Sequence, residues 1–482
     1  MHADSLIARI SSPEANTILD RLYGPEGRES QRARWLDLVR GTLEAFPEHA
    51  ENLRIFSAAG RTELGGNHTD HNLGKVLAAS IQLDALAVVG PRDDTTVRLR
   101  SPGYPDVVVD IEDSAIRPQE KGTTEALVRG IAACFKEKGI AIRGWTANVH
   151  NTVLSGSGLS SSAAIEVLVG AIFNGLYNGG RFDAVEIAKM GQRAENEWFG
   201  KPCGLMDQVA CAHGGAVAID FKDPAKPLVE GVSFDPAQDG LALCVVDTGG
   251  NHADLTDDYA AIPGEMKAVA RALGQENLRG LDEKALIEAA PRLRETCGDR
   301  ALLRALHFLG ENTRVDAMLA ALKAGDTTGF LEAVRESGRS SWCLLQNVFT
   351  PARPVEQGVS LALALTEQFL AAANAGGHAA PESGIAANGP AIRATANAGG
   401  HAVPESGIAA NGAAVRATAN AGGRNAPPGV CRVHGGGFAG TIQAYIPLDK
   451  TDAYRAFMAP VFGEKAVTVL RIRSFGAGEI QI

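Results

Sequence analysis

The chain has 482 residues, of which 45% are hydrophobic and 21% are charged, and this length predicts a globular protein of two domains. Its net charge of −10 argues against a nucleic-acid-binding protein, because a surface that binds phosphates needs an excess of Lys and Arg. The first residues lack the pattern of a signal peptide and no apolar run reaches membrane-spanning length, so we expect a cytoplasmic protein with no membrane partner.

Hydrophobic periodicity predicts a mixture of helices and strands in the first half of the chain. The predicted helices span residues 30–49, 123–139, 160–180 and 183–200. The predicted strands span residues 75–91, 95–103, 106–113, 144–156 and 214–221. A segment rich in Pro, Asp and Gly follows at 223–240 and is interpreted as a connector. We therefore place an N-terminal α+β domain at 1–231 and a C-terminal domain at 232–482.

The C-terminal domain has fewer predicted strands and one unusual segment. Strands are predicted at 241–249, 441–447 and 466–473, with helices between 262 and 370 and at 451–463. A 23-residue unit occupies 373–395 and is repeated almost unchanged at 396–418. These units carry few large apolar side chains, so we interpret residues 373–427 as a duplicated surface insert. A regulatory or binding module is the alternative.

Residues 60–74, GRTELGGNHTDHNLG, combine four glycines with many polar side chains and few residues suited to a core. Glycine gives the backbone conformational freedom, which allows short polar side chains to converge. The stretch therefore indicates a binding site for a polar ligand.

A second motif, VLSGSGLSSSAA at 153–164, places glycines and serines where a helix is predicted to begin. Gly156 and Gly158 allow backbone N–H groups to approach an anion, and the helix N-terminus favours phosphate. The motif lacks the GKS or GKT of a Walker A loop. Simple helix capping is the alternative for this motif taken alone.

Two further features point to a polar site. Glu195 and Asp207 stand twelve residues apart across a predicted helix and turn, a spacing that can aim both carboxylates at one site, although a solvated pair is the alternative. The stretch RVHGGGFAG at 432–440 leads three consecutive glycines into a strand. Such glycines weaken a strand unless another backbone or a ligand comes close.

Together these stretches resemble the galactokinase branch of the superfamily of small-molecule kinases that also phosphorylate homoserine, mevalonate and phosphomevalonate. The resemblance covers almost the whole chain except the repeated insert, and the motifs occur in the family's order. It implies an α+β fold of two domains, with a ferredoxin-like C-terminal domain and the active site in the cleft between the domains. It also implies an enzyme that uses ATP and Mg²⁺ to phosphorylate the C1 hydroxyl of galactose.

The resemblance assigns roles to individual residues. Asp207 corresponds to the catalytic base and Arg61 to the residue that stabilises the transition state. Mg²⁺ would be held by Ser162 and Glu195, whose oxygens suit a hard cation. The triphosphate would be bound by the loop residues Gly156, Ser157, Gly158, Leu159, Ser160, Ser161 and Ser162. The sugar would be bound by Asn67, His68, Thr69, Asp70 and Tyr259. We expect sugar and ATP to be the binding partners and the chain to act as a monomer.

Three positions depart from the family pattern. Leu154 replaces a Pro, His71 replaces a Tyr, and Asn67 replaces a Glu that meets the C6 hydroxyl of the sugar in the family. The change at Asn67 removes a negative charge, so a galactose modified at C6, such as galacturonate, is an alternative substrate to galactose. A catalytically silent sugar sensor is a further alternative, but the loop serines, Glu195 and Asp207 are all present.

Overall fold

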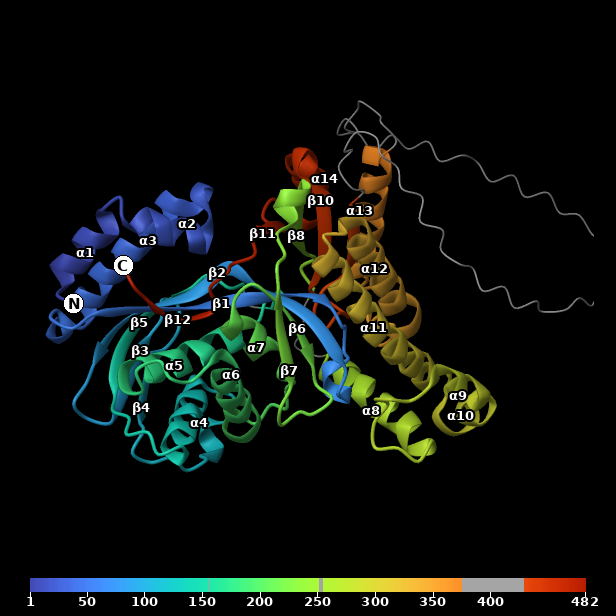
Figure 1. Ribbon diagram of the computed structural model, residues 1–482, viewed down its shortest axis with the longest axis horizontal. Helices are drawn as coiled ribbons and strands as arrows, with labels where there is room; N and C mark the ends of the chain where they lie inside the picture. Colours follow the sequence, from blue (N-terminus) through green and yellow to red (C-terminus); the bar gives the residue numbers. More distant parts are fainter. Residues whose placement is uncertain (155, 251–254, 375–428) are drawn as a thin grey trace, which may run out of the picture.

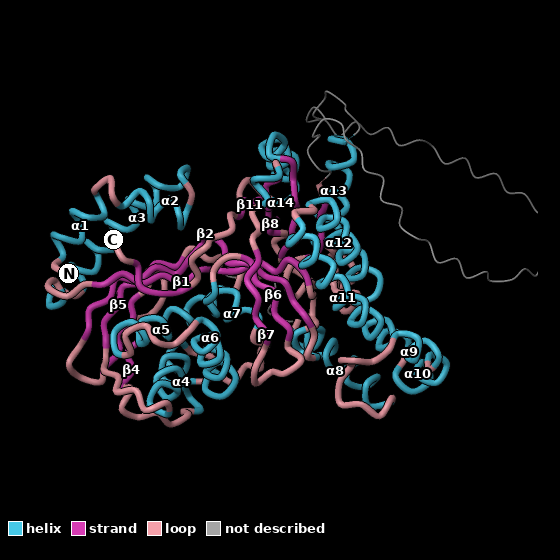
Figure 2. The backbone as a smooth tube through the Cα atoms, viewed as in Figure 1, coloured by secondary structure: helices cyan, strands magenta, loops and turns pink. Residues whose placement is uncertain are grey.

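The computed structural model describes residues 1–154, 156–250, 255–374 and 429–482, and two β-sheets organise these residues (Figures 1 and 2). The first sheet runs in the order β12-β1-β2-β5-β3-β4, and β6 and β7 extend it from β2. Its strands are β1 (Arg54–Gly65), β2 (Lys75–Pro91), β3 (Thr96–Arg100), β4 (Val107–Asp110), β5 (Trp145–Asn151), β6 (Ala216–Asp220), β7 (Leu228–Val232) and β12 (Ala477–Ile480).

Helices cover both faces of the first sheet (Figure 1). One face carries α1 (Ala3–Ser11), α2 (Ala15–Tyr23) and α3 (Arg28–Ala45). The other carries α4 (Thr124–Glu137), α5 (Ser161–Tyr177), α6 (Ala184–Arg193) and α7 (Met206–His213). Successive side chains of a strand alternate between faces, so Leu86 and Val88 of β2 pack with α1 to α3, whereas Ala87 and Val89 pack with the second set.

The second sheet is antiparallel and has the order β11-β8-β10-β9. Its strands are β8 (Leu241–Asp247), β9 (Val430–Val433), β10 (Thr441–Pro447) and β11 (Val467–Leu470). The helices of this half are α8 (Thr256–Ala272), α9 (Glu283–Glu288), α10 (Ala290–Cys297), α11 (Asp299–Ala324), α12 (Thr327–Ser340), α13 (Gly358–Asn374) and α14 (Thr451–Phe462). Cys244 and Val246 face α13 and α14, whereas Leu243 and Val245 pack in the cluster that contains α12.

The structure confirms the predicted α+β class, but it differs from the sequence prediction in several places. Strands β1 and β9 were not predicted. The connector predicted at 223–240 contains β7, which pairs with β6. The helices α1 and α2 were not predicted. The last strand, β12, pairs with β1 in the first sheet, although we assigned 232–482 to the second domain. Local sequence patterns do not show that the last strand joins the first sheet, because this pairing depends on a partner strand more than 400 residues away. The boundary near Gly231 stays a prediction.

None of the helices in the described ranges is long and apolar enough to cross a membrane.

The predicted insert at 373–427 lies outside the described residues except for its first two positions, but the residues that flank it are close together. A Cβ added to Gly429 would lie 2.5 Å from Leu370 Cδ2. Lengthening a loop between two such points costs little, about 0.6 kcal/mol for each doubling of its length. We therefore expect that replacing residues 375–428 with a short Gly-Ser bridge changes the melting temperature by less than about 3 °C.

The control for this deletion replaces the same residues with a Gly-Ser linker of equal length. Calorimetry of both variants separates the effect of loop length from the effect of the repeated sequence. If both variants fail to fold, the repeat packs against the C-terminal half and our interpretation of it as a surface insert is wrong.

Candidate active site

The loop between β5 and α5 has the geometry of an anion-binding loop. Gly156 and Gly158 have φ values of +75° and +69°, which glycine adopts without strain, and Ser160 has φ of 61°. Helix α5 begins at Ser161, and no side chain among the described residues caps its first turn. The free N–H groups and the helix dipole at this end favour a negatively charged ligand.

Arg61 connects this loop to Asp207. Its guanidinium donates to Asp207 Oδ1 from Nε at 2.9 Å and from Nη2 at 2.8 Å, and it also donates to the Gly158 carbonyl. The Ser160 hydroxyl donates to the other carboxylate oxygen, Asp207 Oδ2, at 2.6 Å. Strand β1, the loop and the first turn of α7 therefore meet at one carboxylate.

Asp207 is held ionised but remains accessible. Burial raises the pKa of its carboxyl, but Arg61 and the Ser160 hydroxyl lower it by more, so the net pKa lies below the usual range. The side chain is 35% exposed. A substrate hydroxyl can thus reach a carboxylate that is ready to accept a proton at neutral pH.

A second cluster of carboxylates lies beside the first. The Gln208 amide donates from Nε2 to Glu166 Oε2 at 2.9 Å and to Glu195 Oε2 at 3.0 Å. Glu166 Oε1 accepts from the Ser162 hydroxyl at 2.9 Å. Burial, and then the charge of Glu195, raise the pKa of Glu166 to about 8. Gln208 and Glu166 thus fix the orientation of the two residues predicted to hold Mg²⁺, Ser162 and Glu195.

The donors of this cluster fit a magnesium ion. Mg²⁺ prefers oxygen ligands and keeps several waters, and it binds through one or two carboxylates together with substrate phosphates. The described residues contain no group of three or more His, Cys, Asp and Glu side chains that could hold a metal ion. A magnesium ion here would therefore need phosphate and water ligands as well. Lys201 Nζ lies 3.3 Å from Glu195 Oε1, and its side chain is 65% exposed, so it also offers a positive charge at this edge.

The sugar signature forms a tight turn after β1. Gly66 has φ of +93°, and a Cβ there would lie 2.5 Å from the Lys75 carbonyl, so only glycine fits. The Thr69 hydroxyl is buried and lies 2.9 Å from the Gly66 carbonyl and 2.6 Å from that of Lys75, so it stabilises the turn itself. Asp70 lies against Gly204, where an added Cβ would be 1.9 Å from Asp70 Oδ2. This contact brings the turn to the loop that precedes Asp207.

His68 and Tyr259 stack at one side of this turn. Their ring centroids are 6.5 Å apart, with an angle of 24° between the planes. His68 Nε2 lies 2.9 Å from the Gly436 carbonyl, and the Tyr259 hydroxyl donates to the Gly437 carbonyl at 3.1 Å. Burial lowers the pKa of His68 to about 4, so the ring is neutral and donates this hydrogen bond. Both aromatic residues therefore contact the loop of three glycines.

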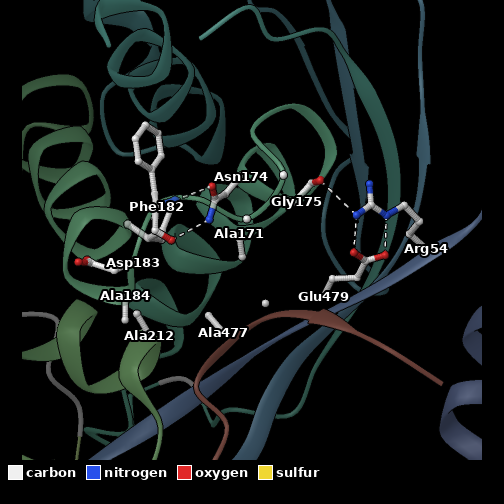
Figure 3. Close-up of a pocket in the computed structure, with 14 residues that line it drawn as sticks. Arg54, Ala171, Asn174, Gly175, Phe182, Asp183, Ala184, Ala212, Ala477 and Glu479 are labelled. Carbon is white, nitrogen blue, oxygen red and sulfur yellow. Dashed lines mark hydrogen bonds and ion pairs between the residues drawn. The ribbon is translucent and has the colours of Figure 1, made fainter. Parts of the chain in front are cut away.

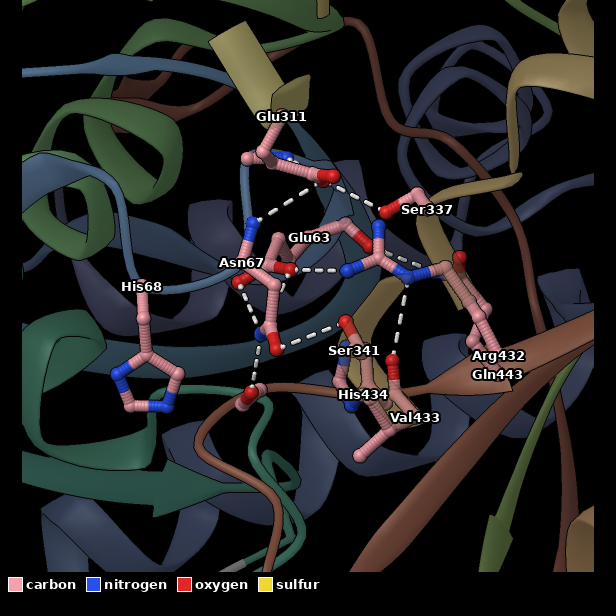
Figure 4. Close-up of polar contacts among 12 residues, drawn as sticks. Glu63, Asn67, His68, Glu311, Ser337, Ser341, Arg432, Val433, His434 and Gln443 are labelled. Atoms are coloured by element: carbon pink, nitrogen blue, oxygen red, sulfur yellow. Dashed lines mark hydrogen bonds and ion pairs between the residues drawn. The ribbon is translucent and has the colours of Figure 1, made fainter. Parts of the chain in front are cut away.

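Asn67 lies beneath the turn, in a buried polar network (Figure 4). Its amide nitrogen donates to Glu63 Oε1 at 3.1 Å and to the Gly435 carbonyl at 2.6 Å. Its amide oxygen accepts from Ser341 at 3.3 Å and from Asn347 at 2.8 Å. All the hydrogen-bonding positions of the Asn67 amide are thus directed at protein groups.

Glu63 carries the charge of this network. Its carboxylate accepts from Arg432 Nη2 at 2.5 Å, and both side chains are almost fully buried. Glu311 lies close by and accepts from the backbone N–H of Gly66 at 3.0 Å. Buried charges are stable only when paired, and Glu311 is paired with Arg314 in α11. The Glu63–Arg432 ion pair and the hydrogen bond from Gly66 to Glu311 connect the sugar signature to the C-terminal half.

The structure adds several residues that the sequence interpretation did not include: Glu63, Glu166, Lys201, Gln208, Glu311 and Arg432. One of them had a local signal. Glu166 follows Ser162 by four residues on one helix face, whereas Glu63 lies in strand β1, where this helical spacing does not apply. Arg432 pairs with Glu63, which lies 369 residues away, so no local pattern identifies it. Glu311 pairs locally with Arg314, but its contact with Gly66 of the sugar signature spans 245 residues and has no local signal.

A separate cavity lies against the first sheet, away from these residues. It has a volume of 340 Å³ and is formed by the end of α5, the start of α6 and β12 (Figure 3). Its polar side chains are already paired, because Arg54 binds Glu479 and Asn174 binds the backbone of Phe182. None of the predicted site residues lines it.

Comparisons with known proteins agree with this geometry. Residues 44–91 match the galactokinase galactose-binding signature, and residues 126–215 match the N-terminal domain of GHMP kinases. A galactokinase of Streptomyces coelicolor is 34% identical over 311 residues, which cover 63% of this chain and 79% of the relative. A galactokinase of Lacticaseibacillus casei is 32% identical over 316 residues, which cover 63% and 78%.

Solved structures show the same fold. The galactokinase of Lactococcus lactis in complex with galactose matches with a TM-score of 0.69 at 21% identity, over 93% of this chain and 100% of that one. The mevalonate kinase of Methanococcus jannaschii matches with a TM-score of 0.54 at 13% identity, over 87% and 98%. The fold is therefore that of the GHMP kinases.

Proposed function

Because the chain belongs to the galactokinase family of ATP-dependent sugar kinases, we propose that it transfers the γ-phosphoryl group of ATP to the C1 hydroxyl of galactose. The observation that carries this proposal is the contact of Arg61 and Ser160 with one accessible, ionised carboxylate, Asp207. Phosphoryl transfer depends mainly on positioning and on neutralising the charge that spreads over the phosphoryl oxygens.

In this proposal each residue around Asp207 has its own role in the phosphoryl transfer. Asp207 accepts the proton of the C1 hydroxyl as that oxygen attacks the γ-phosphorus, and the bond from this phosphorus to the β–γ bridging oxygen breaks so that ADP leaves. Arg61 keeps Asp207 ionised and faces the transferred group. The N–H groups of the 156–162 loop and the start of α5 bind the phosphates.

The carboxylate cluster is suited to the magnesium ion that accompanies ATP. Ser162 and Glu195 would hold it, and Glu166 and Gln208 would keep those two side chains oriented. When bound, such an ion neutralises phosphate charge.

We assign the sugar contacts in two layers. His68, Asp70 and Tyr259 lie at the surface of the site and would contact the sugar. Thr69 would hold the turn in shape. The pattern of the family places residue 67 against C6, and Asn67 would act there through its buried amide, which donates to the Gly435 carbonyl.

An assay of ATP consumption with a panel of sugars tests the function. We expect activity with galactose that requires Mg²⁺, and a product phosphorylated at C1 by NMR. Galacturonate and glucose complete the panel, and mevalonate serves as a control that is not a sugar. A preference for galacturonate would replace galactose as the substrate, and no turnover of any sugar despite bound ATP would overturn the proposed function.

A further inference from the structure

A buried chain of hydrogen bonds runs from the sugar-signature strand to the phosphate loop. Gln443 Nε2 donates to Thr62 Oγ1 at 2.8 Å, and Thr62 Oγ1 lies 3.0 Å from His434 Nε2. On the other side of the ring, His434 Nδ1 lies 3.0 Å from Thr441 Oγ1, which donates to the Ser157 carbonyl at 2.9 Å. All five residues are buried.

The two ends of this chain, together with a neutral His434 ring, determine the direction of every hydrogen bond. The Ser157 carbonyl can only accept, so the Thr441 hydroxyl donates its proton to that carbonyl. The Thr441 oxygen must then accept from His434 Nδ1–H. His434 Nε2 is then an acceptor for the Thr62 hydroxyl, and Thr62 in turn accepts from the Gln443 amide. The chain is consistent throughout with a neutral ring.

The surroundings of His434 support this protonation state. Burial, and then the charges of Arg61 and Arg432, lower its pKa well below the usual value. The ring also packs against the loop, because a Cβ on Gly158 would lie 3.2 Å from His434 Nδ1.

Three consecutive carbonyls of the phosphate loop are tied to the protein. Thr441 holds that of Ser157, the Arg61 side chain holds that of Gly158, and the Arg61 backbone N–H holds that of Leu159 at 3.1 Å. In a planar trans peptide the N–H of the next residue points opposite to the carbonyl. The N–H groups of Gly158, Leu159 and Ser160 therefore point away from these anchors.

We propose that His434 and Thr441 are positioning residues that hold the phosphate loop in its anion-binding shape and connect it to the sugar-signature strand through Thr62. This inference rests on the proposed function, in which the loop binds the phosphates of ATP. It assigns no contact with substrate to either residue.

Thr441→Val tests the proposal, because it keeps the shape of the side chain and removes the hydroxyl. We expect the Kd for ADP with Mg²⁺, measured by calorimetry, to rise roughly 3- to 10-fold, the effect of one lost hydrogen bond and one unpaired carbonyl. The KM for ATP should rise similarly and the KM for galactose less. Thr62→Val should also weaken ADP binding, although Thr62 lies on the sugar-signature strand.

Two variants serve as controls. Thr441→Ser restores the hydroxyl and should recover most of the ADP affinity. Thr366→Val removes an equally buried hydroxyl, which bonds Ala362 and Tyr454 in α13 and α14, and should leave ADP binding within about 2-fold. Unchanged ADP affinity in Thr441→Val, or an equal loss in Thr366→Val, would overturn the proposal. A wild type that binds ADP but phosphorylates no sugar would refute the proposed function instead.

Discussion

Asp207→Asn is expected to lower kcat by roughly 10²-fold or more while leaving the affinity for ATP nearly unchanged. The amide keeps the shape of the carboxylate and can still meet the Ser160 hydroxyl, but it cannot accept the proton of the C1 hydroxyl. Steady-state kinetics with galactose, together with calorimetry of ADP binding, separate these two effects.

The pH dependence of the wild type gives a second expectation for Asp207. Because its pKa is lowered in the folded protein, the carboxylate stays ionised through neutral and mildly acidic pH. Activity that depends on this base should therefore fall only as the pH drops through the lowered pKa, below the usual range for aspartate.

The control for Asp207→Asn is Asp20→Asn. Asp20 is also paired with an arginine, Arg28, and is 32% exposed, but it lies in α2, away from the site. We expect its kcat to match that of the wild type. A kcat near the wild-type value for Asp207→Asn would remove Asp207 from the mechanism.

The glycines at 60–74 show where sequence reasoning reached its limit. We predicted that they give freedom to a polar loop, but Gly60 and Gly65 lie in strand β1. A Cβ at Gly60 would lie 2.9 Å from Val153 Cγ1, and one at Gly65 would lie 2.4 Å from Met318 Sδ. Close packing explains these two glycines, and only the neighbours brought by the fold reveal it.

Only part of the site could be predicted from the sequence, namely the residues that lie in recognisable motifs. Arg61 and Asp207 lie 146 residues apart, and no spacing rule joins them, but each sits in a recognisable motif. Arg432 and Glu63 lie 369 residues apart and lack such a signal, because a strand pattern shows that a side chain is buried and not which charge it meets. The paired charges under the sugar turn therefore required the structure.

This network makes Asn67→Glu the most destabilising substitution we expect. The new carboxylate would replace an amide nitrogen that lies 3.1 Å from Glu63 Oε1 and 2.6 Å from the Gly435 carbonyl. Two charges about 4 Å apart repel by roughly 4 kcal/mol at an effective dielectric of about 20. Protonating one of the two carboxyls at neutral pH costs a similar amount, about 3 to 4 kcal/mol. The variant therefore loses stability whether both carboxylates stay charged or one of them is protonated.

We therefore expect Asn67→Glu to lower the melting temperature by roughly 5–10 °C, and the exchange Glu63→Asn/Asn67→Glu to recover part of that loss. Glu63→Asn alone leaves Arg432 without its counter-ion and should also be destabilising, so the two changes should compensate in a double-mutant cycle. If the losses of stability in the two single variants were strictly additive in the double variant, the charges at residues 63 and 67 would not be coupled.

The same exchange tests the choice of sugar, because it restores a carboxylate at residue 67 without adding a charge to the network. If residue 67 influences C6, the exchange should reduce kcat/KM for galacturonate relative to galactose, since a nearby carboxylate repels a C6 carboxylate by up to roughly 4 kcal/mol. Parallel assays of both sugars in the wild type and the exchanged variant measure this ratio. A wild type that prefers galacturonate and loses it on exchange would make the uronic acid the substrate. An unchanged ratio in a stable exchanged variant would mean that Asn67 serves the buried network alone and does not discriminate at C6.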